Sequence, residues 1–254
     1  MISIIIPTMW KAPHMFKMLP TLNDHPLVGE IIFIDNDKEK ADKEFLGKLN
    51  KLVYLPQEQN IFVNPAWNLG VKHSKYDRLC IINDDCLANI RFLESIYTKL
   101  TPETGLFGFS SDSYSELAAE SSQFSIETFD TMLLQDLGTD VWFNKINPLE
   151  FRDFSGMPHP AYGSFMFMHK ESYYEIPEFK IFYGDLFLYL MNLKNKKQNY
   201  TIENGLICTV MSSSVGTNGF GFIETPPILE DKEAFVPTLQ QYGLYNLDLA
   251  GLDN

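Results

Sequence analysis

The first hundred residues alternate between short apolar runs and segments with helical periodicity. Four runs, rich in β-branched and other apolar residues, have the length of buried strands. They comprise residues 2–6, 30–34, 52–55 and 79–82. The first is expected to stop at Pro7, and a helix is expected over 15–22, kinked or shortened by Pro20. Strands that alternate with helices predict an α/β fold, in which helices flank a central, mostly parallel sheet.

The second half of the chain has a less regular pattern. Apolar runs predict strands near 106–109 and 163–168. Helical spacing predicts helices over 126–137 and 185–193. The acidic tail beyond Pro227 lacks a clear period and is expected to be extended.

Two of the expected helices begin with residues suited to capping. Asn64 can bond free amide groups, and Pro65 would then occupy the first helical position, where its missing N–H costs nothing. Asp185 precedes an apolar, helix-periodic segment and could cap that helix in the same way.

Composition narrows the class of protein. The 254 residues are 45% hydrophobic and 14% aromatic, which argues against disorder. The net charge of −13 repels phosphate backbones and disfavours nucleic-acid binding. Cys80, Cys86 and Cys208 form no CxxC pair, so neither a disulfide framework nor a zinc site is expected. Strand-like sequence from Met1 onward and no apolar run of spanning length predict a soluble, cytoplasmic protein without a membrane segment.

Polar residues follow three of the predicted strands. They are PTMW at 7–10, DND at 35–37 and NDD at 83–85. The carboxyl ends of parallel strands share one edge of a sheet, where open α/β sheets bind their ligands. Three polar strand ends at one edge, two of them acidic, therefore predict a site.

The glycine pattern excludes the common phosphate-binding loops. The chain has no GxGxxG after the first strand, no GxxxxGK[ST] and no GxSxG. A phosphate-bearing ligand must be held another way, and a hard divalent cation between carboxylates and a diphosphate would do so. Asp84 and Asp85 are the candidate ligands, although aspartates at a strand end are also ordinary turn formers.

The order of these features resembles the GT-A-fold glycosyltransferases, most closely their large family-2-like inverting group. The first strand ends in a P-T loop, the stretch N…A-x-N-x-G spans 60–70, and NDD at 83–85 stands in place of the DXD motif. FYGDL at 182–186 resembles the segment that carries the family's catalytic base at the start of a late helix. The resemblance covers about the first hundred residues well and 163–193 more loosely. A bare catalytic domain of this kind is similar to stand-alone bacterial or virus-encoded enzymes.

This resemblance implies a metal-dependent, inverting transferase that moves a hexose from a UDP-sugar to an acceptor hydroxyl. Asp85 and Asp84 would bind Mn²⁺ or Mg²⁺, and Asp185 would take the proton from the acceptor. Residues expected at the nucleotide sugar are Pro7, Thr8, Trp10, Asp35, Asn36, Asn68, Asn83, Asp84 and His159.

The resemblance also suggests a division of the chain. A single domain over 1–254 would have a donor-binding half, 1–100, an acceptor-binding half, 101–225, and a tail, 226–254. The expected partners are a UDP-sugar and a carbohydrate or glycan acceptor, and the tail could act as a lid or as the arm of a homodimer.

Departures from the family pattern keep alternatives open. Asn83 replaces the first acid of DXD, Gly184 stands where the family has a glutamate, and no histidine occurs over 208–217 to serve as a late metal ligand. Asp35 could be a turn residue and His159 a structural one. Trp10 and Trp67 could stack on a base or a sugar, and core packing is the favoured alternative for Trp67. A retaining transferase, a nucleotidyltransferase and a non-catalytic nucleotide-sugar-binding module remain rival functions.

Overall fold

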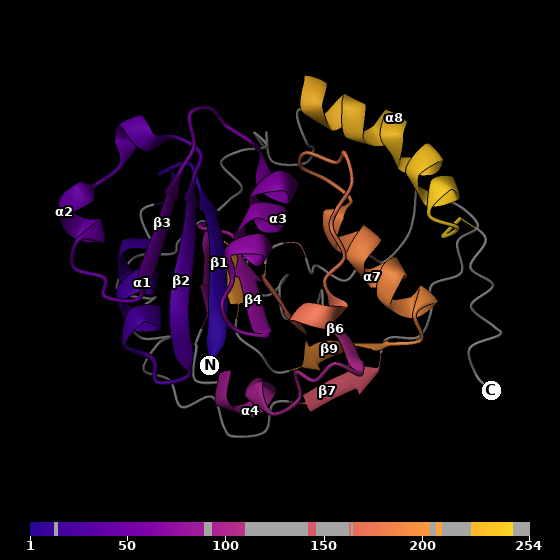
Figure 1. Cartoon of the computed structure of the whole chain (residues 1–254), viewed down its shortest axis with the longest axis horizontal. Helices are drawn as coiled ribbons and strands as arrows, with labels where there is room; N and C mark the ends of the chain where they lie inside the picture. The colour runs from indigo at the N-terminus through magenta and orange to yellow at the C-terminus, as the bar shows by residue number, and fades with distance from the viewer. Residues whose placement is uncertain are drawn as a thin grey trace.

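A computed structural model shows how the chain folds (Figure 1). It describes residues 1–12, 15–88, 93–109, 142–145, 163, 165–203, 207–209 and 225–245. The helix expected over 126–137 and the candidate residue His159 lie outside these residues.

The described strands form one large sheet and one small one. The large sheet has eight strands in the order β3-β2-β1-β4-β8-β6-β9-β7, and β10 pairs with β5 in the small one. Their bounds are β1 Ile2–Thr8, β2 Val28–Asp35, β3 Leu52–Pro56, β4 Arg78–Ile82, β5 Cys86–Ala88, β6 Thr104–Phe109, β7 Trp142–Lys145, β8 Phe165–His169, β9 Gln198–Glu203 and β10 Ile207–Thr209.

The large sheet is parallel where it meets the predicted site. β3, β2, β1 and β4 run parallel to one another, β8 is antiparallel to both β4 and β6, and β9 pairs parallel with β6 and antiparallel with β7. Four of these seven pairings are parallel, which confirms the α/β class and the mostly parallel sheet. Since β1, β2 and β4 are neighbours, their carboxyl ends lie side by side.

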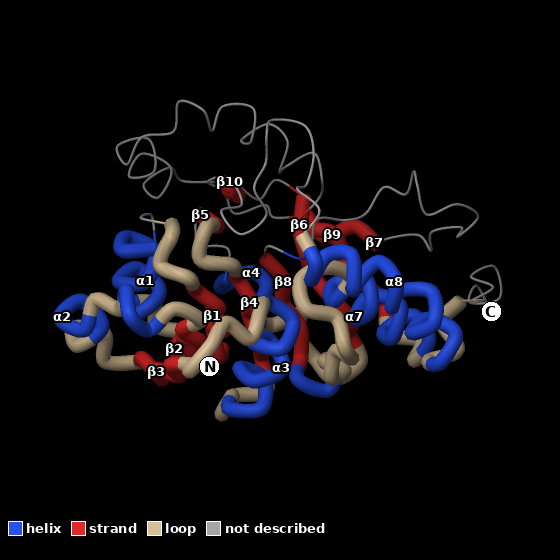
Figure 2. Tube along the Cα trace, turned by 90° about the horizontal axis from the view of Figure 1, so that it is seen from above, coloured by secondary structure: helices blue, strands red, loops and turns tan. Residues whose placement is uncertain are grey.

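Helices cover both faces of this sheet. The helices are α1 Met15–Asp24, α2 Lys43–Leu46, α3 Val63–His73, α4 Leu93–Tyr97, α7 Gly184–Lys194 and α8 Pro226–Gln241, with 3₁₀ turns at Lys38–Lys40 and Lys170–Ser172. Buried residues of α1, α2 and α4 form a core with one face, and those of α3, α7 and α8 form a second core with the other. Figure 2 shows α1 and α3 on opposite sides of β1 and β4.

Neither Pro7 nor Pro20 ends the element in which it lies. β1 continues through Pro7 to Thr8, because its pairing with β4 ends at Ile5 and the missing N–H of Pro7 interrupts no bond on that side. α1 continues past Pro20 to Asp24, and beside the proline the Thr21 hydroxyl donates to the Lys17 carbonyl at 2.9 Å.

Two expected helix caps are wrong. α3 begins at Val63, so Asn64 and Pro65 lie inside its first turn and Phe62 is the N-cap. α7 begins at Gly184 with Tyr183 as its N-cap, so Asp185 is a first-turn residue and not the cap. Both caps sit at positive φ, 66° and 64°, a conformation that favours glycine and makes a pattern-based assignment miss the helix start.

The tail is not extended over its described part. Residues 226–241 form α8, with prolines at its first two positions. Buried Phe235 and Leu239 place this helix against α7, beside which it lies in Figure 1. Within the described residues, no helix has both the length and the apolar character needed to span a membrane.

Gly70 lets α3 approach the sheet closely. A Cβ at this position would lie 2.3 Å from the Ile5 Cγ2 and 3.2 Å from the Ile34 Cδ1. Both isoleucines are fully buried, so neither can move aside without disturbing the core. Gly70, the glycine of the A-x-N-x-G stretch, therefore serves helix–sheet packing.

We expect Gly70→Ala to destabilise the fold by about 1–3 kcal/mol through overpacking, despite the better helix propensity of alanine. Chemical unfolding would measure the change. Lys72→Ala, at an exposed position of the same helix, is the matched control and should unfold like the native chain. A Gly70→Ala chain as stable as the control would contradict the close approach.

Candidate active site

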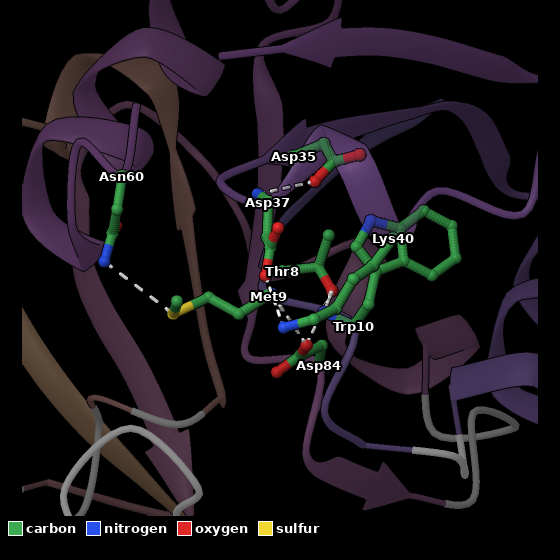
Figure 3. A network of polar contacts seen from close by, with 8 residues as sticks. All are labelled: Thr8, Met9, Trp10, Asp35, Asp37, Lys40, Asn60 and Asp84. Carbon is green, nitrogen blue, oxygen red and sulfur yellow. Dashed lines mark hydrogen bonds and ion pairs between the residues drawn. The ribbon is translucent and has the colours of Figure 1, made fainter. Parts of the chain in front are cut away.

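The ends of β1, β2 and β4 meet through direct hydrogen bonds. Thr8 pairs in register with Asp35, and the Asn36 N–H donates to the Thr8 carbonyl at 2.9 Å. The Thr8 hydroxyl donates to the Asp84 carboxylate at 2.7 Å, and the Met9 N–H donates to the same oxygen at 3.4 Å (Figure 3). The prediction that these polar strand ends share one edge is confirmed.

Asp84 and Asp85 differ in how their charges are supported. Burial raises the pKa of Asp84, and the hydrogen bonds from Thr8 and Met9 oppose that rise. Burial, and then the charge of Asp84, raise the pKa of Asp85 to about 6. The Cys86 thiol donates to the Asp85 carboxylate at the long distance of 3.7 Å. The negative charge of Asp85 is thus less well compensated by hydrogen bonds than that of Asp84.

Asn83 links this cluster to a distant part of the chain. Its Nδ2 donates to the Gly163 carbonyl at 3.2 Å, while its Oδ1 is buried without a hydrogen-bond partner. A Cβ on Gly163 would lie 3.0 Å from the Asp185 Oδ2. The backbone of Gly163 therefore lies between Asn83 and Asp185, and its lack of a side chain leaves room for the Asp185 carboxylate.

Asp35 is fully buried and already has two partners. One oxygen accepts the Asp37 N–H at 2.9 Å, and the other accepts the Tyr54 hydroxyl at 2.7 Å. Burial, and then the bond to Asp35, raise the pKa of Tyr54. The Asn36 side chain accepts the Ile61 N–H at 3.2 Å. Both residues shape the strand-end loops, and their contact with a nucleotide stays a prediction.

Two other expected donor-site residues have packing partners. The Trp10 backbone has a φ of 60° and donates to the Thr8 hydroxyl at 2.9 Å. Its ring packs edge-on against Phe33, with centroids 5.5 Å apart, and tilts against Phe16. This places the Trp10 ring on the α1 side of the sheet. Pro7 is likewise buried within β1.

Asn68 is the sixth residue of α3, and its side chain bonds to the segment 173–176. Its Oδ1 accepts the Tyr173 hydroxyl at 2.6 Å and the Ile176 N–H at 2.9 Å, and its Nδ2 donates to the Ile176 carbonyl at 2.8 Å. These contacts hold residues 173–176 in place, and the contact of Asn68 with the donor stays a prediction. Trp67 is buried in the core, as its packing alternative required.

The described residues offer oxygen donors for a cation but no complete cluster. They hold no group of three or more His, Cys, Asp or Glu side chains that could hold a metal ion. Asp85 and the unpaired Oδ1 of Asn83 are hard oxygen donors, which suit Mg²⁺ or Mn²⁺ when water and ligand oxygens complete the shell. The hydrogen bonds from Thr8 and Met9 both reach Asp84 Oδ2, so this oxygen joins the residues after β4 to the end of β1.

Sequence reasoning missed several residues that shape this region. Gly163, Tyr54 and Asp231 lie far along the chain from their partners Asp185, Asp35 and 180–182. A phenol or a glycine in an apolar segment carries no local signal for such contacts.

Comparisons with known proteins address the family and the fold of the chain. A model described as "Glycosyl transferase family 2" matches residues 3–176. No curated protein matches the chain. Among solved structures, GalNAc-T7 with UDP, GalNAc and Mn²⁺ is similar at a TM-score of 0.58 and 10% identity, over 95% of this chain and 50% of that one.

Two further solved structures are similar over shorter stretches. TarS residues 1–349 from S. aureus has a TM-score of 0.38 at 16% identity, over 43% of this chain and 35% of that one. HddC from Yersinia pseudotuberculosis has a TM-score of 0.36 at 15% identity, over 43% and 59%. In each case this chain spans less than two thirds of the solved protein's length.

The GalNAc-T7 likeness shows that the fold is of the GT-A type. The family match begins in β1, runs through the three polar strand ends and reaches Ile176, which is more than half of the chain. The chain therefore belongs to glycosyl transferase family 2.

Proposed function

We propose that this glycosyltransferase moves a hexose from a UDP-sugar to a carbohydrate hydroxyl, with inversion at the anomeric carbon and with Mn²⁺ or Mg²⁺ bound. The proposal rests on two contacts of Gly163. Its carbonyl accepts a hydrogen bond from the Asn83 side chain, and the Asp185 carboxylate occupies the space that a side chain at Gly163 would fill. These contacts set a carboxylate from the first turn of α7 beside the acidic end of β4. A group that can take a proton and a group that can anchor a diphosphate thus belong to one site.

The donor would lie across the carboxyl ends of β1, β2 and β4. Thr8, Asp35 and Asn36 would face the nucleoside, since they line the loops after β1 and β2. A structural neighbour solved with UDP, GalNAc and Mn²⁺ supports this class of donor. Residues 1–100 would then form the donor half, and 101–225 the acceptor half, with His159 as a candidate contact.

The charge at Asp85 supports a divalent cation. Asp85 is 9% exposed and lies beside the buried carboxylate of Asp84, so its ionised form lacks solvation. Asp85, with the unpaired Oδ1 of Asn83, would hold the ion, and Asp84 would keep the loop after β1 in place. When bound, a cation supplies positive charge that stabilises the leaving diphosphate.

Asp185 would act as the general base. Its carboxylate takes the proton of the acceptor hydroxyl as that oxygen bonds to the anomeric carbon, while the bond from this carbon to the diphosphate oxygen breaks. UDP leaves with the electron pair of the broken bond. Attack from the face opposite the leaving group gives a product of inverted configuration, so a product of retained configuration would disprove the mechanism.

Calorimetric titration of UDP, with and without Mn²⁺, tests the donor site first. We expect binding that requires Mn²⁺ and that weakens at least about 10-fold in Asp85→Ala, because a ligand of the cation is lost. Asp77→Ala is the matched control, since Asp77 is an exposed aspartate just before the opposite end of β4. If UDP binds equally well without Mn²⁺ and in Asp85→Ala, the two carboxylates do not hold a cation for the diphosphate and serve as turn residues.

The raised pKa of Asp85 predicts a gain in stability when its charge is removed. The folded chain binds this proton more tightly than the unfolded chain, so Asp85 lowers stability as the pH rises from about 4 to 6, by up to about 3 kcal/mol. Without metal, Asp85→Asn should therefore melt higher than the native chain at pH 8 and like it below pH 4.

The exposed Glu39 supplies the control for that experiment. Glu39→Gln removes one charge from the same acidic chain and should change the melting temperature little at either pH. An Asp85→Asn chain that melts lower than the native one at pH 8 would show that the ionised carboxylate stabilises the fold, contrary to the prediction.

Asp185→Asn should lower kcat by about 10²–10⁴-fold and leave the Kd for UDP unchanged, because it removes the base and keeps the shape. Gly163→Ala should lower kcat as well, since its Cβ would displace the Asp185 carboxylate. Glu178→Gln, at an exposed position before α7, is the control. The kcat of all three variants is measured by steady-state turnover of a donor found by screening. A normal kcat in Asp185→Asn would exclude Asp185 as the base.

A further inference from the structure

Residues 180–182, which lead into α7, donate their three backbone N–H groups to one side chain. Asp231 of α8 accepts the N–H of Lys180 at 2.7 Å, of Ile181 at 2.7 Å and of Phe182 at 2.8 Å. Asp231 is 1% exposed, so these bonds replace the water that its carboxylate loses on burial. A buried carboxylate with three amide donors strongly favours one conformation of this loop.

The carbonyl groups of the same loop bond to the other side, to α3. The Asn64 N–H donates to the Lys180 carbonyl at 3.0 Å, and the Asn64 Nδ2 donates to the Phe182 carbonyl at 2.9 Å. Asn64 is fully buried, and a Cβ on Gly184 would lie 2.1 Å from its Oδ1. The first residue of α7 is thus packed directly against the first turn of α3.

The residue between this loop and α7 is held in a costly conformation. Tyr183 has a φ of 64°, which a bulky residue adopts only when its surroundings demand it. Its ring stacks on Phe235 of α8, with centroids 4.2 Å apart and planes 24° apart. Asp231 and Phe235 lie one helical turn apart on α8, so one face of that helix holds both the loop and the strained residue.

We propose that Asp231 is a positioning residue for catalysis: with Asn64 opposite, it fixes 180–183 so that the first turn of α7 holds Asp185 against Gly163. This inference rests on the proposed role of Asp185 as the base. Asp231 and Asn64 form the clamp, and their hydrogen bonds run to residues 180–182. The Asp231 side of the clamp lies outside the stretch 3–176 that the family model matches.

Hydrogen exchange of the whole chain tests the clamp without any substrate. Asp231→Asn keeps the shape of the side chain but places an NH₂ group against N–H donors. We expect the amides of 181–188 to exchange about 10- to 100-fold faster, while those of β1 and β4 keep their protection. Glu230→Gln is the matched control, because Glu230 is an exposed neighbour on α8 that binds the Lys180 side chain. Unchanged exchange over 181–188 in Asp231→Asn would overturn the proposal.

Kinetics then separate positioning from general stability. With a donor that the native enzyme turns over, Asp231→Asn should lower kcat about 10- to 100-fold and leave the Kd for UDP with Mn²⁺ within about twofold. Equal loss of kcat and UDP binding, or normal kcat despite faster exchange, would contradict the positioning role. If the native chain turns over no UDP-sugar, the proposed function fails, while the exchange result still decides the clamp.

A second pair of variants covers the case in which Asp231→Asn does not fold. Gly184→Ala should speed exchange over 184–188, because its Cβ meets the Asn64 Oδ1, and Asn64→Ala in the same chain should relieve that contact. Asn64→Ala alone should speed exchange over 180–182 by releasing the two carbonyl groups. If Asn64→Ala leaves both segments unchanged, α3 does not hold the loop and the clamp is excluded.

Discussion

The structure depends on how two adjacent carboxylates are accommodated at the buried end of β4. A strand of apolar residues delivers Asp84 and Asp85 into a region with little water, where an unpaired charge is costly. Parallel pairing of β1 with β4 supplies the Thr8 hydroxyl and the Met9 N–H to Asp84. Asp85 receives no equivalent donor from the described strand ends, and this asymmetry is the reason we propose Asp85 as the cation ligand.

The same edge of the sheet is joined to the second half of the chain through very small groups. Asn83 bonds to the backbone of Gly163, and Asp185 occupies the space that a side chain at Gly163 would fill. Gly184 and Asn64 repeat this arrangement between α7 and α3. Two glycines therefore set the distance between the proposed base and the proposed diphosphate site, because they allow backbone and polar side chains to approach within contact distance.

The family match and the neighbouring helices carry different parts of the function. Residues 3–176 contain the three polar strand ends and place the chain in glycosyl transferase family 2. α7 and α8 follow this stretch, and α8 supplies the carboxylate that orders the loop before α7. A helix expected to be an extended tail thus takes part in positioning the proposed base. Over 226–241 the acidic tail forms α8, and its buried residues Phe235 and Leu239 pack into the core shared with α3 and α7.

The sequence by itself determined the strands of the first hundred residues, the α/β class and the shared edge of Thr8, Asp35 and Asp84, because apolar period and strand-end polarity are local signals. It did not determine the partners that other candidate residues have within the fold: Asn68 bonds to Ile176, and the Trp10 ring packs against Phe33. The starts of α3 and α7 and the burial of Asp231 also came only from tertiary structure. Positive φ at Phe62 and Tyr183, and contacts across about fifty residues, are stabilised by packing that no short window of sequence contains.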